Sequence, residues 1–66
     1  MKITLNGIER DIENLQNLET IIRQSCKNTG RVIAELNGEI IKAPRWEGTT
    51  LREGDSVELV SFVGGG

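Results

Sequence analysis

The chain has 66 residues, and its eight Lys and Arg against ten Asp and Glu give a formal charge of −2, so it offers no basic field for nucleic acid or anionic lipid. It has no histidine and one cysteine, Cys26, which excludes a zinc site, a Cys–His or Ser–His catalytic pair and an internal disulfide. We therefore expect a protein that is not an enzyme and binds no cofactor.

The longest apolar runs are pairs such as Ile21-Ile22, far short of a membrane span. The opening Met1-Lys2-Ile3-Thr4-Leu5 lacks an apolar core of signal-peptide length. A single cysteine also fits a reducing compartment. These features predict a cytoplasmic protein without a membrane partner, which we expect to be monomeric when free.

Residues 2–12 have the pattern of a β-hairpin. Lys2-Ile3-Thr4-Leu5 alternates polar and apolar side chains, which is the period of a half-buried strand. Asn6-Gly7 follows, a pair suited to a type I′ turn because both central residues need a positive φ. Residues 8–12 then return as a second strand.

The pattern of residues 17–30 changes to that of an amphipathic helix. One helical stripe collects the least polar positions, namely Leu18, Ile21, Ile22, Ser25 and Cys26. Asn17 is the expected N-cap and Asn14 the alternative, one turn earlier. Asn28-Thr29-Gly30 provides a residue for a left-handed stop. On this stripe Cys26 is expected to pack as a small buried hydrophobe.

The second half of the chain is rich in strand and turn signals. Strands are expected over residues 32–36 and 39–42, joined by a second Asn-Gly turn, and Pro44 ends the pairing. Residues 45–50 form a loop that Trp46 anchors, and residues 52–55 form a turn. The last strand covers residues 56–63, with Val60 and Phe62 on the face opposite Val57.

The order of elements is strand, strand, helix, strand, short strand, strand. A helix that crosses between strands places the first and last strands side by side in the sheet. We therefore predict an α+β fold of the β-grasp type, with a mixed sheet of four or five strands and one helix packed across one face. Residues 1–63 form this domain, and residues 64–66 form a flexible glycine tail.

The tail Gly64-Gly65-Gly66 is not explained by packing, because glycine costs backbone entropy and adds no buried surface. It is either a frayed end or a slim segment that enters the active site of another protein. In the second case the reactive group is the carboxylate of Gly66, which must be converted to an acyl-adenylate before a nucleophile can attack it.

The whole chain resembles the sulfur-carrier proteins of the ubiquitin-like β-grasp superfamily, and most closely the ThiS family. The resemblance rests on the residue 3–7 hairpin, the hairpin over residues 36–41, Pro44-Arg45-Trp46, and the segment from Val57 to Gly66. The combination of a β-grasp pattern with a diglycine terminus is its most specific part. Three glycines stand where the family has two, so Gly64 is expected to act as a spacer.

The resemblance implies a cycle in which a ThiF-type enzyme uses ATP to adenylate the Gly66 carboxylate. Sulfur from cysteine, delivered by a cysteine desulfurase, then replaces AMP and leaves a thiocarboxylate. A ThiG-type thiazole synthase accepts that sulfur. Gly65 and Gly66 match the family's functional terminus, and Val60 with Phe62 forms the expected partner-binding surface.

Other functions remain open on the sequence. A small subunit of molybdopterin synthase would share the fold and the tail. A ubiquitin-like modifier would be joined to lysines, and a plain interaction module would not need its last glycines.

Overall fold

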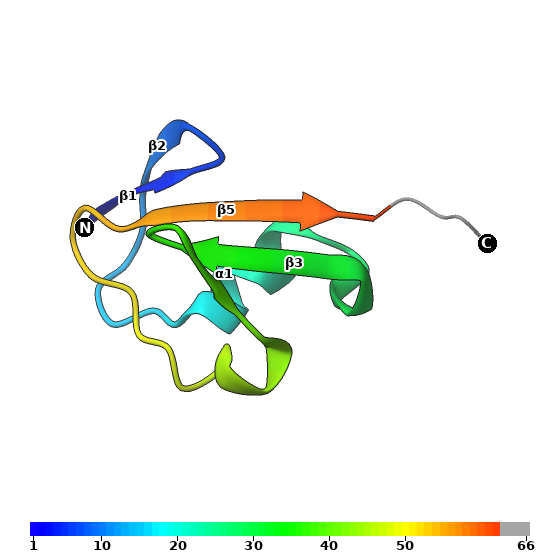
Figure 1. The fold of residues 1–66 in the computed structure, drawn as a ribbon. Coiled ribbons are helices and arrows are strands. Elements are labelled where there is room, and N and C mark those ends of the chain that lie inside the picture. Colours follow the sequence, from blue (N-terminus) through cyan, green and yellow to red (C-terminus); the bar gives the residue numbers. More distant parts are fainter. Residues whose placement is uncertain (63–66) are drawn as a thin grey trace.

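The computed structural model describes residues 1–62, so Val63 and the glycine tail lie outside the described residues (Figure 1). The strands are β1 (Lys2–Leu5), β2 (Ile8–Asp11), β3 (Val32–Leu36), β4 (Glu39–Ile41) and β5 (Ser56–Ser61). The helix α1 covers Leu18–Ser25, and two 3₁₀ turns, η1 and η2, cover Thr29–Arg31 and Ala43–Arg45.

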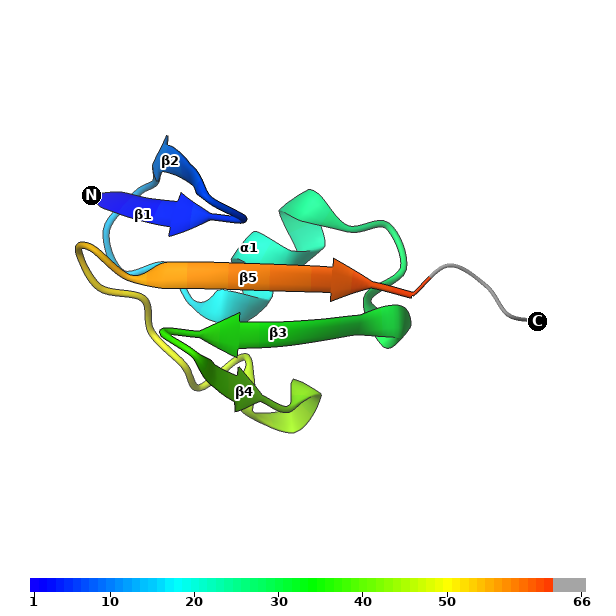
Figure 2. The same cartoon turned by 45° about the horizontal axis from the view of Figure 1, so that its top comes forward.

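The five strands form one mixed sheet in the order β2-β1-β5-β3-β4, and α1 lies across one of its faces (Figure 2). The first and last strands pair in parallel, whereas the other neighbouring strands pair antiparallel. This arrangement confirms the α+β, ubiquitin-like β-grasp prediction, including the adjacency of the first and last strands.

The core fills the space between the sheet and α1. Alternate strand residues point toward the helix, as the two-residue period of a strand requires. The buried side chains come from the sheet, the helix and the connection before β5: Ile3, Leu5, Leu18, Ile21, Ile22, Ala34, Ile41, Trp46, Leu51 and Val57. Below, the sheet face turned away from α1 is called the outer face.

Trp46 anchors the connection between β4 and β5, as expected. Its side chain is buried, and its indole Nε1–H donates to the Ile41 carbonyl at 2.7 Å. Burying an indole is favourable when its N–H finds a partner. The connection is more regular than the loop predicted from the sequence, because Pro44 occupies the first turn of η2, where its missing N–H costs nothing.

Both Asn-Gly pairs form the expected tight turns. Asn6 and Gly7 have φ values of +50° and +81°, and Asn37 and Gly38 have +52° and +86°. Only a primed turn places both central residues in this region, and it matches the right-handed twist of the flanking strands.

The two turn asparagines also hold the central strand β5. The Asn6 Oδ1 accepts the Leu59 N–H at 2.7 Å, on the side of β5 where β1 has already ended. The Asn37 Oδ1 accepts the Ser56 N–H at 2.9 Å at the start of β5. Each side chain therefore supplies an acceptor where the neighbouring strand has none, and β5 keeps hydrogen bonds at positions that strand pairing does not reach.

Helix α1 begins where the sequence places it but ends differently. The Asn17 Oδ1 accepts the Thr20 N–H at 2.8 Å, which confirms Asn17 as the N-cap over Asn14. The chain leaves the helix through an extended Cys26, so the predicted left-handed stop at residues 28–30 is wrong. As a result Ser25 is exposed rather than buried, and Cys26 is only partly buried.

Three strand ends also differ from the prediction. The second strand stops at Asp11, the fourth at Ile41 and the fifth at Ser61, one residue earlier than predicted for the first two and two residues earlier for the last. The Phe62 N–H nevertheless donates to the Arg31 carbonyl at 2.8 Å, so one further rung extends the β3–β5 ladder.

One register pair in this ladder is electrostatically unfavourable. Glu35 of β3 lies directly opposite Glu58 of β5, and the next pair on the outer face is Ile33 opposite Val60. Directly opposite side chains on one sheet face lie about 5 Å apart at Cβ, and like charges there are destabilising.

The hydrogen bond from Leu59 to Asn6 can be tested with a matched pair of variants. Asn6→Gly keeps a residue that tolerates positive φ but removes the acceptor, so we expect a loss of about 1 kcal/mol of unfolding free energy. Asn6→Asp keeps an acceptor and should lose clearly less. Urea unfolding measures both, and equal losses would show that the side-chain acceptor contributes nothing.

The Glu35–Glu58 pair predicts a stabilising substitution. Glu58→Gln should raise the free energy of unfolding by about 0.2–1 kcal/mol, because it removes the like-charge contact. Glu35→Gln should act similarly, and the double variant should gain less than the sum, since either change alone ends the repulsion. Glu13→Gln, at an exposed position outside the sheet, is the control. If the gains in unfolding free energy are no larger than that of the control, or are fully additive, Glu35 and Glu58 do not repel each other.

Candidate functional site

The predicted reactive residues Gly64, Gly65 and Gly66 lie outside the described residues, and β5 is the strand that leads to them. β5 is the central strand, paired with β1 on one side and β3 on the other. Its ladder ends at Phe62, four residues before Gly66. The last described backbone before the tail is therefore held by the middle of the sheet.

Val60 and Phe62, the predicted partner-binding residues, are both solvent-exposed. Their exposed fractions are 51% and 54%, large for apolar side chains in so small a domain. Val60 lies on the outer face, because it alternates with the buried Val57 and with Leu59, which packs against the core. The structure thus leaves both side chains accessible to a partner.

Two isoleucines that the sequence reasoning did not single out extend this apolar area. Ile33 lies directly opposite Val60, and Ile40, which is 60% exposed, lies on β4 opposite Glu35. We call Ile33, Ile40, Val60 and Phe62 the outer-face patch. The alternation of residues 32–36 already indicated that Ile33 points outward, but only the strand register shows that it adjoins Val60.

Two acidic side chains, Glu35 and Glu58, lie beside the residues of the outer-face patch. Ile40, Glu35 and Glu58 form one row across β4, β3 and β5, and Ile33 with Val60 forms the next. Glu58 is exposed and Glu35 is partly exposed. Among residues 1–62, the ion pairs that form join Lys2 to Glu9 and Asp11, and Arg23 to Glu19, so neither glutamate of the row is paired.

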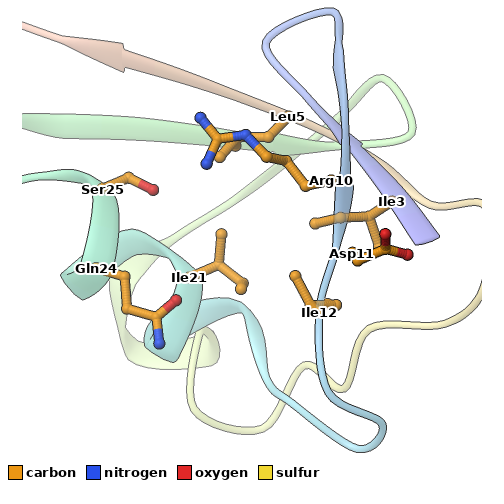
Figure 3. Close-up of a pocket in the computed structure, with 8 residues that line it drawn as sticks. All are labelled: Ile3, Leu5, Arg10, Asp11, Ile12, Ile21, Gln24 and Ser25. Carbon is orange, nitrogen blue, oxygen red and sulfur yellow. The ribbon is translucent and has the colours of Figure 1, made fainter. Parts of the chain in front are cut away.

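A hollow of about 150 Å³ lies on the other side of the sheet, between the β1–β2 hairpin and α1 (Figure 3). Figure 3 shows side chains of the hairpin and of α1 turned toward one another around it. Its apolar floor and polar rim are formed by Ile3, Leu5, Arg10, Asp11, Ile12, Ile21, Gln24 and Ser25. Asp11 is the one carboxylate in this set, and no hydrogen bond joins it to the Ser25 hydroxyl, so these lining residues do not form a nucleophile–base pair.

Cys26 takes no part in either surface. Its backbone N–H donates to the Ile22 carbonyl at 2.8 Å and closes the helix, and its side chain is partly buried. Within residues 1–62 there is no group of three or more Cys, Asp or Glu side chains that could hold a metal ion. In that same part of the chain, no helix has the length and apolarity to cross a membrane.

The chain matches the ThiS family over residues 3–66. In structure it is similar to the thiamine biosynthesis protein (ThiS) of Geobacter metallireducens. The crystal structure of that protein has 30% sequence identity and a TM-score of 0.84, with both chains fully covered. An NMR solution structure of a thiamine biosynthesis protein from the same organism gives 30% identity and a TM-score of 0.78 over all of this chain and 88% of that one.

Two sequence relatives are also similar. A protein named thiazole synthase from Paramagnetospirillum magneticum (strain ATCC 700264 / AMB-1) is 30% identical over all 66 residues, and the chain spans only 20% of its length. The protein named ycf40 of Trieres chinensis is 31% identical over 62 residues, which is 94% of this chain and 85% of that protein. The family match over residues 3–66, together with the shared β-grasp fold, shows that this chain belongs to the ThiS family.

Proposed function

We propose that this protein is a sulfur carrier in the synthesis of the thiazole part of thiamine, with the carboxylate of Gly66 as its reactive group. The observation that carries the proposal is the ThiS-family match, which runs through the glycine tail to residue 66. The fold supports it, because the central strand is hydrogen-bonded on both sides and its ladder ends only four residues before that glycine.

The chemistry follows from the poor reactivity of a carboxylate. An ionised carboxylate resists nucleophilic attack, and joining it to AMP supplies a good leaving group. In the proposed cycle a ThiF-type enzyme forms this acyl-adenylate from ATP and releases pyrophosphate. The outer sulfur of a persulfide, which a desulfurase forms from cysteine, then displaces AMP and joins Gly66 as an acyl disulfide. A thiol reductant cleaves its S–S bond and leaves Gly66 as a thiocarboxylate.

The carrier itself performs none of these steps. Its ThiS-type fold is that of a small carrier domain, which supports a protein co-substrate that partner enzymes recognise. A ThiG-type thiazole synthase is the proposed acceptor of the sulfur. The similarity to a longer protein named thiazole synthase supports this choice.

Recognition by these enzymes is assigned to the outer-face patch. Contiguous exposed apolar side chains on a small monomer commonly mark a protein interface. Phe62 is the closest described residue to the tail, so an enzyme that holds Gly66 in its active site must also cover or pass beside it.

The proposal predicts a mass change that depends on three components. In buffer that contains a thiol reductant, incubation with a ThiF-type adenylating enzyme, ATP and a persulfide-loaded desulfurase should exchange one oxygen of the carrier for one sulfur, as read by intact-protein mass spectrometry. A variant that lacks Gly65 and Gly66 should show no exchange. Transfer of the sulfur to thiazole synthase supports the thiamine pathway, whereas transfer only to a molybdopterin synthase, or isopeptide-linked products, would contradict it.

Phe62→Asp should leave the fold intact and weaken adenylation. The side chain is already half exposed, so its loss removes little core packing, but a charge at an apolar docking point should lower kcat/KM for adenylation about tenfold or more. Pyrophosphate release measures the rate. Ile8→Asp is the matched control, because Ile8 is 60% exposed and lies on the edge strand β2. Equal rates for the two variants would remove Phe62 from the interface.

A further inference from the structure

The acidic pair Glu35 and Glu58, beside the outer-face patch, limits which side chains a partner can place against this face. We propose that the activating enzyme places a cationic side chain, best a guanidinium, between Glu35 and Glu58 when it docks on the outer-face patch. This inference rests on the proposed function and adds the charge and the position of the contact.

The two carboxylates of the pair lie close together. Glu35 and Glu58 are directly opposite on adjacent strands, so their carboxylates share one small area of the outer face. None of the ion pairs within residues 1–62 involves Glu35 or Glu58. Lys2, on the neighbouring strand β1, instead contacts Glu9 and Asp11 of β2 at 3.5 and 3.8 Å. The free carrier thus tolerates the repulsion only because water solvates both groups.

Docking of a partner on this face removes water from the two carboxylates. Ile40 lies beside Glu35 in the same row, and the Ile33–Val60 pair forms the adjacent row, so a partner that buries the isoleucines also removes water from the carboxylates. A buried carboxylate without a counter-ion is strongly unfavourable. A partner that covers this patch must therefore bring a cation with it.

A guanidinium suits this position better than an ammonium group. A guanidinium donates from several N–H groups in one plane, so it can bind two carboxylates at once, and its flat faces pack well on apolar side chains. An ammonium group is more strongly hydrated and lacks this planar shape. The two carboxylates lie beside Ile40 and the apolar Ile33–Val60 row, and this setting favours arginine.

The activating enzyme is the partner that fits this contact. Gly66 follows Val60 by six positions, and a segment of this length reaches at most about 20 Å, so a protein seated on Val60 has Gly66 close to its active site. The activating enzyme must hold ATP and a carboxylate, both anions, and therefore presents a positive field around its site. The Glu35–Glu58 pair matches that field and is attracted toward it.

The test uses the full carrier and the ThiF-type enzyme that activates it. Glu35→Gln and Glu58→Gln should each raise KM for the carrier about tenfold, with kcat nearly unchanged, because they remove binding that ground state and transition state share. Rising salt should weaken activation of the unchanged carrier more than that of the double variant. Glu13→Gln combined with Glu47→Gln removes the same charge from exposed positions outside the strands and should leave KM unchanged.

The outcomes separate the two proposals. If the unchanged carrier is activated and the paired variants behave like the control, the cation contact is overturned and the sulfur-carrier function stands. Loss confined to transfer to thiazole synthase assigns the patch to that enzyme, and a carrier dimer that only the variants dissociate assigns it to a second copy; either result overturns the contact with the activating enzyme. Failure of every ThiF-type enzyme tested to activate the unchanged carrier overturns both proposals.

Discussion

The fold depends on keeping β5 hydrogen-bonded in the middle of the sheet although one of its neighbours is too short to pair with its full length. Pairing with β1 covers only Ser56 and Val57 of β5. Asn6 then continues that side through its side chain, which accepts from Leu59, while β3 pairs with β5 from Val57 to Ser61. The residue that makes the first hairpin turn is thus also the one that lengthens the hydrogen bonding of the central strand.

The two faces of the sheet carry separate tasks because strand residues alternate. Val57 is fully buried toward α1, and Leu59 packs against the same core, so this side of β5 stabilises the domain. Glu58 and Val60 point to the other side, where their exposure contributes little to stability. A repulsive pair and an apolar patch are tolerable there since the core does not depend on them. The residues of the outer face can therefore serve partner binding without loss of core packing.

The elements whose cause is local could be predicted from the sequence. Asn-Gly turns, the Asn17 cap and the alternation of β1 depend on residues within a few positions of one another, and all of them were found. The stop of α1 could not be found this way, because the chain leaves the helix at Cys26 without using the glycine that the pattern offered. The outer-face patch required the register of β3 against β5, which joins Ile33 to Val60 across 27 positions of sequence. No periodicity carries that information.

A carrier of this kind needs a rigid grip close to a segment without side chains. Under the proposed function, six positions of chain reach at most about 20 Å beyond Val60, so an enzyme that works on the carboxylate of Gly66 also lies close to the outer-face patch. Each enzyme that reacts with Gly66 must then cover overlapping parts of the same face, and the partners must bind in turn rather than together. Exchange between them favours moderate affinity, and the outer-face patch provides it, because its apolar contacts are few and the contact of Glu35 and Glu58 with a cation gains only what remains after the charges lose their water.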